Sequence, residues 1–195
     1  MISQKEIKHN RLIEKADELF VSLGYKGVSM DQIAKEAGVS KMTMYKYFSS
    51  KEELFIKTIL SLANRTFLYI KEQLEKIDGT LGKIDFLLNF SIEYSKKYSL
   101  AFYKDIMDNP YVLEKLMAEK IRMTKDVFEG IIINGKERGE IREVDEKFIS
   151  GMLIALMKGV DNEYINTINS KEELDDFTEK FYDFLKYGLL GGRNE

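Results

Sequence analysis

The sequence predicts an all-α protein of about nine helices, with three short helices first and a larger helical body after them. Two observations carry this prediction. The chain has one proline in 195 residues, and proline is the residue that helix interiors exclude most strongly. Apolar side chains also recur at helical spacing rather than in the alternation of a strand. A content of 44% hydrophobic and 32% charged residues is too apolar for a disordered chain.

Local signals place the three short helices. The first is expected over residues 5–23 and is amphipathic. Its apolar stripe consists of Leu12, Ala16, Leu19, Phe20 and Leu23. The second opens at the capping box that begins with Ser29 and stops at Gly38, which permits a sharp turn. The third runs from Lys41 to about Tyr47 and is capped by Ser40.

The body begins with a long helix that opens at the second capping box, Ser50 to Glu53, and continues to about Ile77. The Asp78-Gly79 pair breaks it. Most residues of segment 84–94 are apolar or aromatic and cover every side of a helix, which predicts a buried, central helix.

Four further helices complete the expected body. Asn109-Pro110 separates a helix that ends near Asp108 from one that runs to about Arg138. An eighth helix carries an apolar stripe from Phe148 onward. A third capping box, Ser170 to Glu173, opens a last helix that ends at Gly188 or Gly191.

The charge is unevenly distributed along the chain. The net charge is −3, but residues 1–51 hold nine basic and six acidic side chains, a local +3. Residues 52–195 hold the remaining 21 basic and 27 acidic side chains, a local −6. A basic segment attracts nucleic acid and an acidic one repels it. We therefore expect a binding domain over 1–51 and a helical domain with another task over 52–195.

The segment most informative about function is SMDQIAKEAGVSKMTMYKYF, residues 29–48. Two short helices joined by a tight turn form a helix-turn-helix, whose second helix enters the major groove of DNA. The side chains expected to pack the two helices together and onto Phe20 are Ile33, Ala34, Val39, Met44 and Phe48. The outward side chains of the second helix are hydroxyl or ammonium groups, which suit phosphate oxygens and base edges.

Residues 16–55 resemble the tetracycline-repressor (TetR) family of bacterial regulators. The matching text is A-x-x-L-F-x-x-x-G-Y-x-x-V-S at 16–29, I-A-K-E-A-G-V-S at 33–40 and T-x-Y-x-Y-F-x-S-K-E-E-L-F at 43–55. The resemblance implies that Thr43 and Tyr45 contact DNA and that Lys46 and Lys51 hold phosphates. The full set of candidate DNA contacts is Ser29, Ser40, Lys41, Thr43, Tyr45, Lys46 and Lys51.

Two positions depart from the family pattern. Met42 stands where a small residue is common, and it could contact a thymine methyl group or merely avoid a clash. Lys46 stands where histidine is common, and it keeps a donor while adding a fixed charge. Tyr47 and Phe48 are expected in the core rather than against DNA.

A DNA-binding domain this small gains affinity by binding two half-sites of a palindromic operator, which requires a homodimer. The resemblance implies a four-helix interface built from the last two helices of each subunit, and their apolar stripes agree with it. The alternative is that these stripes pack within one subunit. The expected interface residues are Phe148, Met152, Leu156, Val160, Phe177, Phe181, Phe184 and Leu185.

The resemblance also implies that the body encloses a small effector whose binding releases DNA, so that the protein is a repressor. An aromatic and methionine-rich lining suits a small, largely apolar or aromatic molecule, although aromatic residues at helical spacing are more often core. The candidate pocket residues are Phe86, Phe90, Glu93, Tyr94, Phe102, Tyr103, Met107, Met123 and Phe128. The alternative is a DNA-bound regulator controlled by protein partners without an inducer.

Enzyme chemistry finds no support in the composition. The chain has no cysteine and one histidine, His9, which we expect to be solvated. No metal-ligand cluster and no nucleophile–base pair can be assembled from this set, so no metal, cofactor or catalytic residue is expected. No signal-peptide pattern and no apolar run of about 20 residues occurs, so a soluble, cytoplasmic protein is expected.

Overall fold

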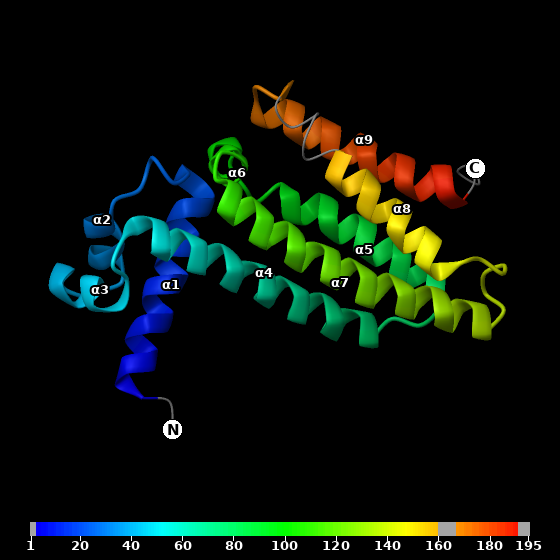
Figure 1. Ribbon diagram of the computed structural model, residues 1–195, viewed down its shortest axis with the longest axis horizontal. Helices are drawn as coiled ribbons and strands as arrows, with labels where there is room; N and C mark the ends of the chain where they lie inside the picture. The colour runs from blue at the N-terminus through cyan, green and yellow to red at the C-terminus, as the bar shows by residue number, and fades with distance from the viewer. Residues whose placement is uncertain (1–2, 160–166, 191–195) are drawn as a thin grey trace. The chain divides into compact units, whose positions relative to one another are not determined.

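The computed structural model describes residues 3–159 and 167–190, the side chains of 157–159 and 185–190 excepted. In these ranges every regular element is a helix (Figure 1). The helices are α1 (Gln4–Leu23), α2 (Met30–Glu36), α3 (Lys41–Tyr47), α4 (Lys51–Glu75), α5 (Thr80–Ser95), α6 (Leu100–Met107), α7 (Pro110–Glu137), α8 (Glu146–Gly159) and α9 (Lys171–Leu190). The predicted fold class is confirmed, and so is the order of its elements.

The helices pack into two compact units, which we call the first unit (residues 1–66 and 97–117) and the second unit (residues 67–96 and 118–195). The first unit therefore holds more than the three short helices, because it takes in part of α4, all of α6 and the start of α7. A division by packing differs from a division by task. The functional boundary between residues 51 and 52 stays a prediction.

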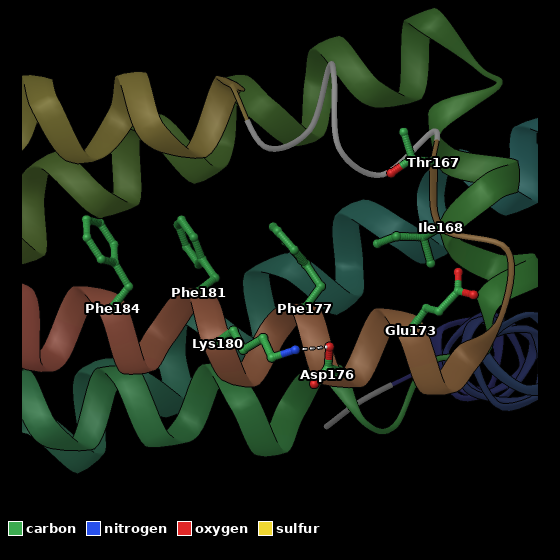
Figure 2. Close-up of a pocket in the computed structure, with 8 residues that line it drawn as sticks. All are labelled: Thr167, Ile168, Glu173, Asp176, Phe177, Lys180, Phe181 and Phe184. Atoms are coloured by element: carbon green, nitrogen blue, oxygen red, sulfur yellow. Dashed lines mark hydrogen bonds and ion pairs between the residues drawn. The ribbon is translucent and has the colours of Figure 1, made fainter.

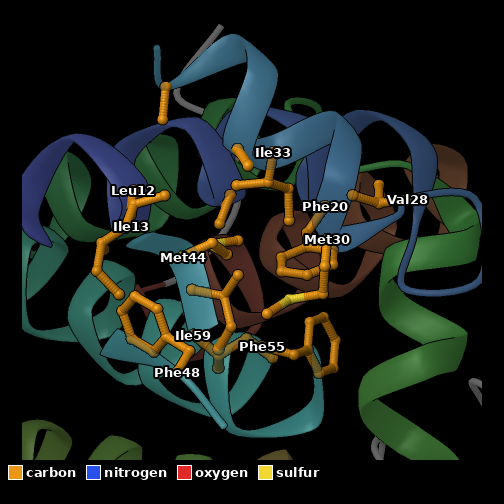
Figure 3. Close-up of a cluster of buried hydrophobic side chains, with 14 of the residues drawn as sticks. Leu12, Ile13, Phe20, Val28, Met30, Ile33, Met44, Phe48, Phe55 and Ile59 are labelled. Carbon is orange, nitrogen blue, oxygen red and sulfur yellow. The ribbon is translucent and has the colours of Figure 1, made fainter. Parts of the chain in front are cut away.

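The core of the first unit is continuous and closely packed (Figure 3). Phe20 of α1 meets Phe55 of α4 edge to face, with ring centroids 5.0 Å apart. Phe55 also contacts Phe102 of α6, at 6.1 Å between ring centroids. Complete burial of such a side chain contributes about 1.5–3 kcal/mol. This core fixes α2 and α3 on the platform formed by α1, α4 and α6.

The loop after α1 is tied to α6. The backbone N–H of Ser99 donates to the Val21 carbonyl at 3.0 Å, and the Asp105 carboxylate accepts from the backbone N–H of Tyr25. Gly24 turns the chain here with φ 73°, and a Cβ at this position would lie 2.8 Å from the Cβ of Ala101. Glycine is needed for both reasons, and α1 is thereby held against α6.

The second unit has a smaller buried cluster around Leu74, Leu87 and Ile131, and α5 lies beside α9 (Figure 1). The expectation that segment 84–94 is enclosed on every side is wrong. Asn89 and Glu93 are exposed, and the Asn89 amide donates to Asp85 at 2.9 Å. These polar residues recur every four positions, so they form one solvent-facing stripe that a count of apolar residues overlooks.

None of the helices in the described ranges has the length and apolar character needed to cross a membrane.

Candidate nucleic-acid interface

The helix-turn-helix at residues 29–48 forms as its sequence predicts. Ile33, Met44 and Phe48 have no solvent exposure, and Val39 packs partly buried against the same cluster as Phe20. Gly38 makes the turn with φ 65°, a conformation that glycine adopts without strain. The next backbone N–H, that of Val39, returns to the Ala34 carbonyl at 2.9 Å. The predicted inner face is confirmed.

Serine hydroxyls start both helices of the motif. Ser29 Oγ accepts from the Gln32 backbone N–H at 3.1 Å, and Ser40 Oγ accepts from the Thr43 backbone N–H at 3.1 Å. Each bond satisfies an amide that the helix itself leaves unpaired. The Ser40 and Thr43 hydroxyls are also 2.9 Å apart and hydrogen bonded. Both serines thus stabilise the starts of these helices, and this role does not depend on the predicted contact with DNA.

The outer side of α3 carries three exposed side chains in one row. Met42 is 70% exposed and Tyr45 46% exposed, and Lys46 is exposed beside them. Residues three and four apart share one face of a helix, whereas Met44 and Phe48 face the core. The fold therefore presents an apolar, an aromatic and a cationic group together on the second helix of the motif, the helix that enters the major groove in helix-turn-helix proteins.

Two of the predicted contact residues are engaged within the fold. The Lys41 ammonium lies 2.8 Å from the Asp31 carboxylate of α2, and this hydrogen bond raises the pKa of Lys41. Thr43 is half-buried. The Asp31–Lys41 pair is not predictable from the sequence pattern, because ten residues and a turn separate its members.

Lys51 is the first residue of α4 and is half-buried. Its ammonium lies 4.2 Å from the ring centroid of Tyr25, within the range of cation–π attraction. Burial lowers the pKa of Lys51. The aromatic ring holds the charge at the start of a helix, where the backbone amides also favour an anion.

His9 is not solvated as expected. Its ring is half-buried and stacks on Phe48, with centroids 5.3 Å apart and planes 27° apart. It also meets Tyr47 at 6.0 Å, and the Tyr47 hydroxyl donates to the Lys5 carbonyl at 3.2 Å. The start of α1 therefore supports the end of α3. No local pattern signals this contact, which joins residues 39 positions apart.

The predicted dimer residues that fall within the described ranges lie on α8 and α9 of the second unit. Phe148 is 62% exposed, Met152 47% exposed and Phe184 62% exposed, and Leu156 is exposed as well. Phe177 and Phe181 are half-buried and stack at 6.0 Å. Val160 and the side chain of Leu185 lie outside the described residues.

A groove of about 450 Å³ runs along α9. Figure 2 shows Phe177, Phe181 and Phe184 on the same side of this helix, with Lys180 bound to Asp176 at 2.7 Å. The residues that line this groove include three of the predicted dimer residues and none of the candidate effector residues.

The candidate effector residues divide between the two units. In the second unit Phe86, Phe90 and Tyr94 form a stacked row along α5, with centroids 5.7 and 5.0 Å apart. Met123 and Phe128 are half-buried in the same unit, and Glu93 is exposed with Lys96 at 3.4 Å. In the first unit Phe102 is buried in the core, and Tyr103 and Met107 are half-buried. In the described ranges no group of three or more histidine or carboxylate side chains could hold a metal ion.

A helix-turn-helix with an exposed second helix, carried on a larger helical body, defines a DNA-binding transcriptional regulator. Comparison with known proteins agrees. Residues 12–58 match the family described as bacterial regulatory proteins, tetR family. Residues 12–58 therefore carry the amino-terminal sequence of this family.

The relatives and solved structures that resemble the chain are regulators of this kind. The HTH-type transcriptional activator FasR of Mycolicibacterium smegmatis is 26% identical over 122 residues, which is 63% of this chain and 55% of that protein. A TetR-family regulator of Mesorhizobium loti has 25% identity and a TM-score of 0.68, covering 96% of this chain and 98% of that one. The regulator FadR of Bacillus subtilis, solved with stearoyl-CoA, has 18% identity and a TM-score of 0.62, covering 92% and 98%.

Proposed function

We propose that this regulator is a homodimeric repressor that binds a palindromic DNA operator and leaves it when a small, largely apolar or aromatic effector binds. The observation that carries the DNA-binding part is the exposed face of α3, with Tyr45 and Lys46 outward and Met44 buried. A helix anchored in this way can enter the major groove without losing its core contacts.

The candidate contacts fall into two groups. Thr43 and Tyr45 are assigned to base edges, because Tyr45 is exposed and the Thr43 hydroxyl keeps acceptor capacity beside its bond to Ser40. Lys46 and Lys51 are assigned to phosphates, because neither ammonium is held by a carboxylate among the contacts described above. We assign contacts with the sugar-phosphate backbone of the DNA to the residues at the edges of the motif, Ser29, Ser40 and Lys41.

The phosphate assignments are tested by the salt dependence of binding. Each of the variants Lys46→Ala and Lys51→Ala should weaken binding to every duplex and flatten the plot of log affinity against log salt by about one unit. Lys76→Ala is the matched control, because Lys76 pairs with Glu72 on the part of α4 that belongs to the second unit. An unchanged slope in both test variants would defeat these assignments.

Dimerisation is supported by the apolar face of α8. Phe148, Met152 and Leu156 recur every four residues and are all exposed, and exposed apolar patches mark interaction sites. Met152→Asp should shift the sedimentation of the micromolar protein from dimer to monomer. Leu81→Asp is the control, because Leu81 is also exposed in the second unit but lies on α5. A wild-type monomer would refute the dimer.

The effector proposal draws support from the half-buried aromatic row on α5. Tyr69 of α4 adds a fourth ring at 5.5 Å from Phe90, and such surfaces suit flat or apolar ligands. Stearoyl-CoA is the first probe, because FadR of Bacillus subtilis was solved with it. It should release a fluorescent duplex from the wild type and release less from Phe90→Ala. If neither this probe nor a panel of other apolar and aromatic molecules releases DNA, control by protein partners becomes the better proposal.

We propose repression because a dimer whose operator overlaps a promoter would exclude RNA polymerase. The test places a reporter gene behind a DNA sequence that the protein selects from a random pool. Expression of this reporter should fall when the protein is produced in the same cell. The name of the FasR relative calls it an activator, so a rise in reporter expression is the outcome that would reverse this part of the proposal.

A further inference from the structure

Met42 has the largest exposed fraction of the exposed large hydrophobic side chains in the described part of the chain, at 70%. It is the second residue of α3, between Lys41 and Thr43. Met44, two positions on, has no exposure and supplies the apolar anchor of this helix. Met42 therefore contributes nothing to the core, and the fold holds its thioether side chain in water on the face that meets DNA.

The neighbours of Met42 make this placement specific. Lys41 turns its ammonium to Asp31 at 2.8 Å, and the Thr43 hydroxyl bonds to Ser40 at 2.9 Å. Both polar side chains that flank Met42 are thus engaged with the motif itself. Met42 and Tyr45, three residues apart on one face, are the exposed large apolar or aromatic side chains of α3.

In the major groove only one of the four standard bases presents an apolar group, the C5-methyl of thymine. The first residues of a recognition helix are those that reach base edges. A methionine side chain is flexible and polarisable, so it fits against a small apolar group without a fixed geometry. Covering both groups removes apolar surface from water, which is favourable.

We propose that Met42 is a specificity-determining residue that contacts the C5-methyl group of a thymine in each operator half-site. The proposal rests on the DNA-binding function and adds to it the base feature that is recognised. It predicts sensitivity to a single methyl group, which contacts to phosphates cannot produce.

The experiment first selects duplexes from a random pool with the full-length wild-type protein. Each thymine of a selected duplex is then replaced, one at a time, by deoxyuridine, which removes only the methyl group. Wild-type affinity should fall about fourfold at one thymine per half-site, the effect of burying one methyl-sized group. Met42→Ala should bind the thymine and deoxyuridine duplexes equally at that position, whereas Met42→Leu should keep most of the discrimination.

Two controls distinguish the loss of methyl recognition from a general weakening of DNA binding. Lys46→Ala should bind every duplex more weakly and still lose affinity on deoxyuridine substitution. Met42→Gln keeps the length of the side chain without its apolar end and should lose the discrimination, so the test does not depend on the alanine variant alone. Thermal unfolding of each variant should match the wild type, because Met42 lies outside the core.

Each outcome has a defined meaning. Equal wild-type binding to all deoxyuridine duplexes would overturn the proposal while leaving DNA binding intact. Discrimination that survives in Met42→Ala and Met42→Gln would overturn it too and would transfer methyl recognition to another residue. A wild type that enriches no duplex would overturn the DNA-binding function and the inference together. Some selected duplexes will carry cytosine at the contacted position. If replacing this cytosine with 5-methylcytosine raises the affinity of the wild type but not that of Met42→Ala, the result would further support the proposal.

Discussion

The two units of this regulator use their apolar side chains differently. In the first unit Phe20, Phe48 and Phe55 are buried in one continuous cluster to which α1, α2, α3, α4, α6 and α7 contribute. In the second unit Phe148 and Phe184 are exposed, and the buried cluster around Leu87 is small. A helix that reads bases must be held rigidly, whereas apolar surface that binds a second subunit or a ligand must be open before it binds.

The largest expected effect tests this contrast with one residue type. Phe55→Ala should lower the free energy of unfolding by about 3–5 kcal/mol, because it empties the site between Phe20, Tyr25 and Phe102. Phe148→Ala should lower it by less than about 0.5 kcal/mol in dilute protein. Chemical denaturation of both variants measures the difference.

The protein concentration sharpens that comparison. Since a dimer stabilises its subunits by mass action, the loss caused by Phe148→Ala should grow as the protein is concentrated, and the loss caused by Phe55→Ala should not. Similar losses for the two variants at every concentration would break the contrast between the units.

A second prediction compares two helix caps. Ser40→Ala and Ser170→Ala each remove the oxygen that accepts a backbone amide, of Thr43 and of Glu173, both at 3.1 Å. Each should lower the free energy of unfolding by about 1 kcal/mol. Only Ser40→Ala should also weaken DNA binding in a gel-shift assay, because it loosens the start of α3. Equal DNA binding by both variants would mean that the cap does not position α3.

The caps also show what the sequence could predict. Ser29, Ser40, Ser50 and Ser170 cap helices as expected, because the partners are three residues apart and local rules decide. The glutamates of the second and third capping boxes differ in detail. Glu53 and Glu173 accept from the backbone N–H of the residue before the cap, at 2.8 Å in each case.

What the sequence could not predict is non-local. The stacking of His9 on Phe48 and the pairing of Lys41 with Asp31 depend on how α1, α2 and α3 are placed in space. The candidate effector residues are mostly aromatic residues and methionines, yet they do not lie together. Phe102 belongs to the core of the first unit, whereas Phe90 belongs to the second unit. Periodicity identifies an apolar face but does not say which surface covers it.

The third prediction concerns Glu53 in the first unit. Its carboxylate accepts from the hydroxyl of Ser49 at 2.7 Å and lies 3.0 Å from Lys57, and these bonds lower its pKa to about 2. A lowered folded-state pKa contributes stability above the ordinary pKa, and this contribution is lost as the pH falls through the folded value. Glu53→Gln should therefore be less stable than the wild type at neutral pH, and this difference should disappear as the pH falls through about 2. A difference that does not change with pH would contradict the assignment.

The smallest expected effect has the opposite sign and lies at the contact of α1 with α4. Asp17 pairs with Arg65, but its Oδ1 atom is buried without a partner in the structure, and burial raises the pKa of this carboxyl despite the arginine. A raised folded-state pKa means that stability is fully present below the ordinary value and is lost as the pH rises through the folded value. Asp17→Asn removes that loss. Its stability relative to the wild type should rise as the pH increases above the ordinary aspartate value of about 3.9. The stability of Glu53→Gln relative to the wild type should instead fall as the pH increases from about 2 to about 4.3. If both variants shift in the same direction, burial does not govern Asp17, and the first unit tolerates a buried charge at this contact better than its close packing implies.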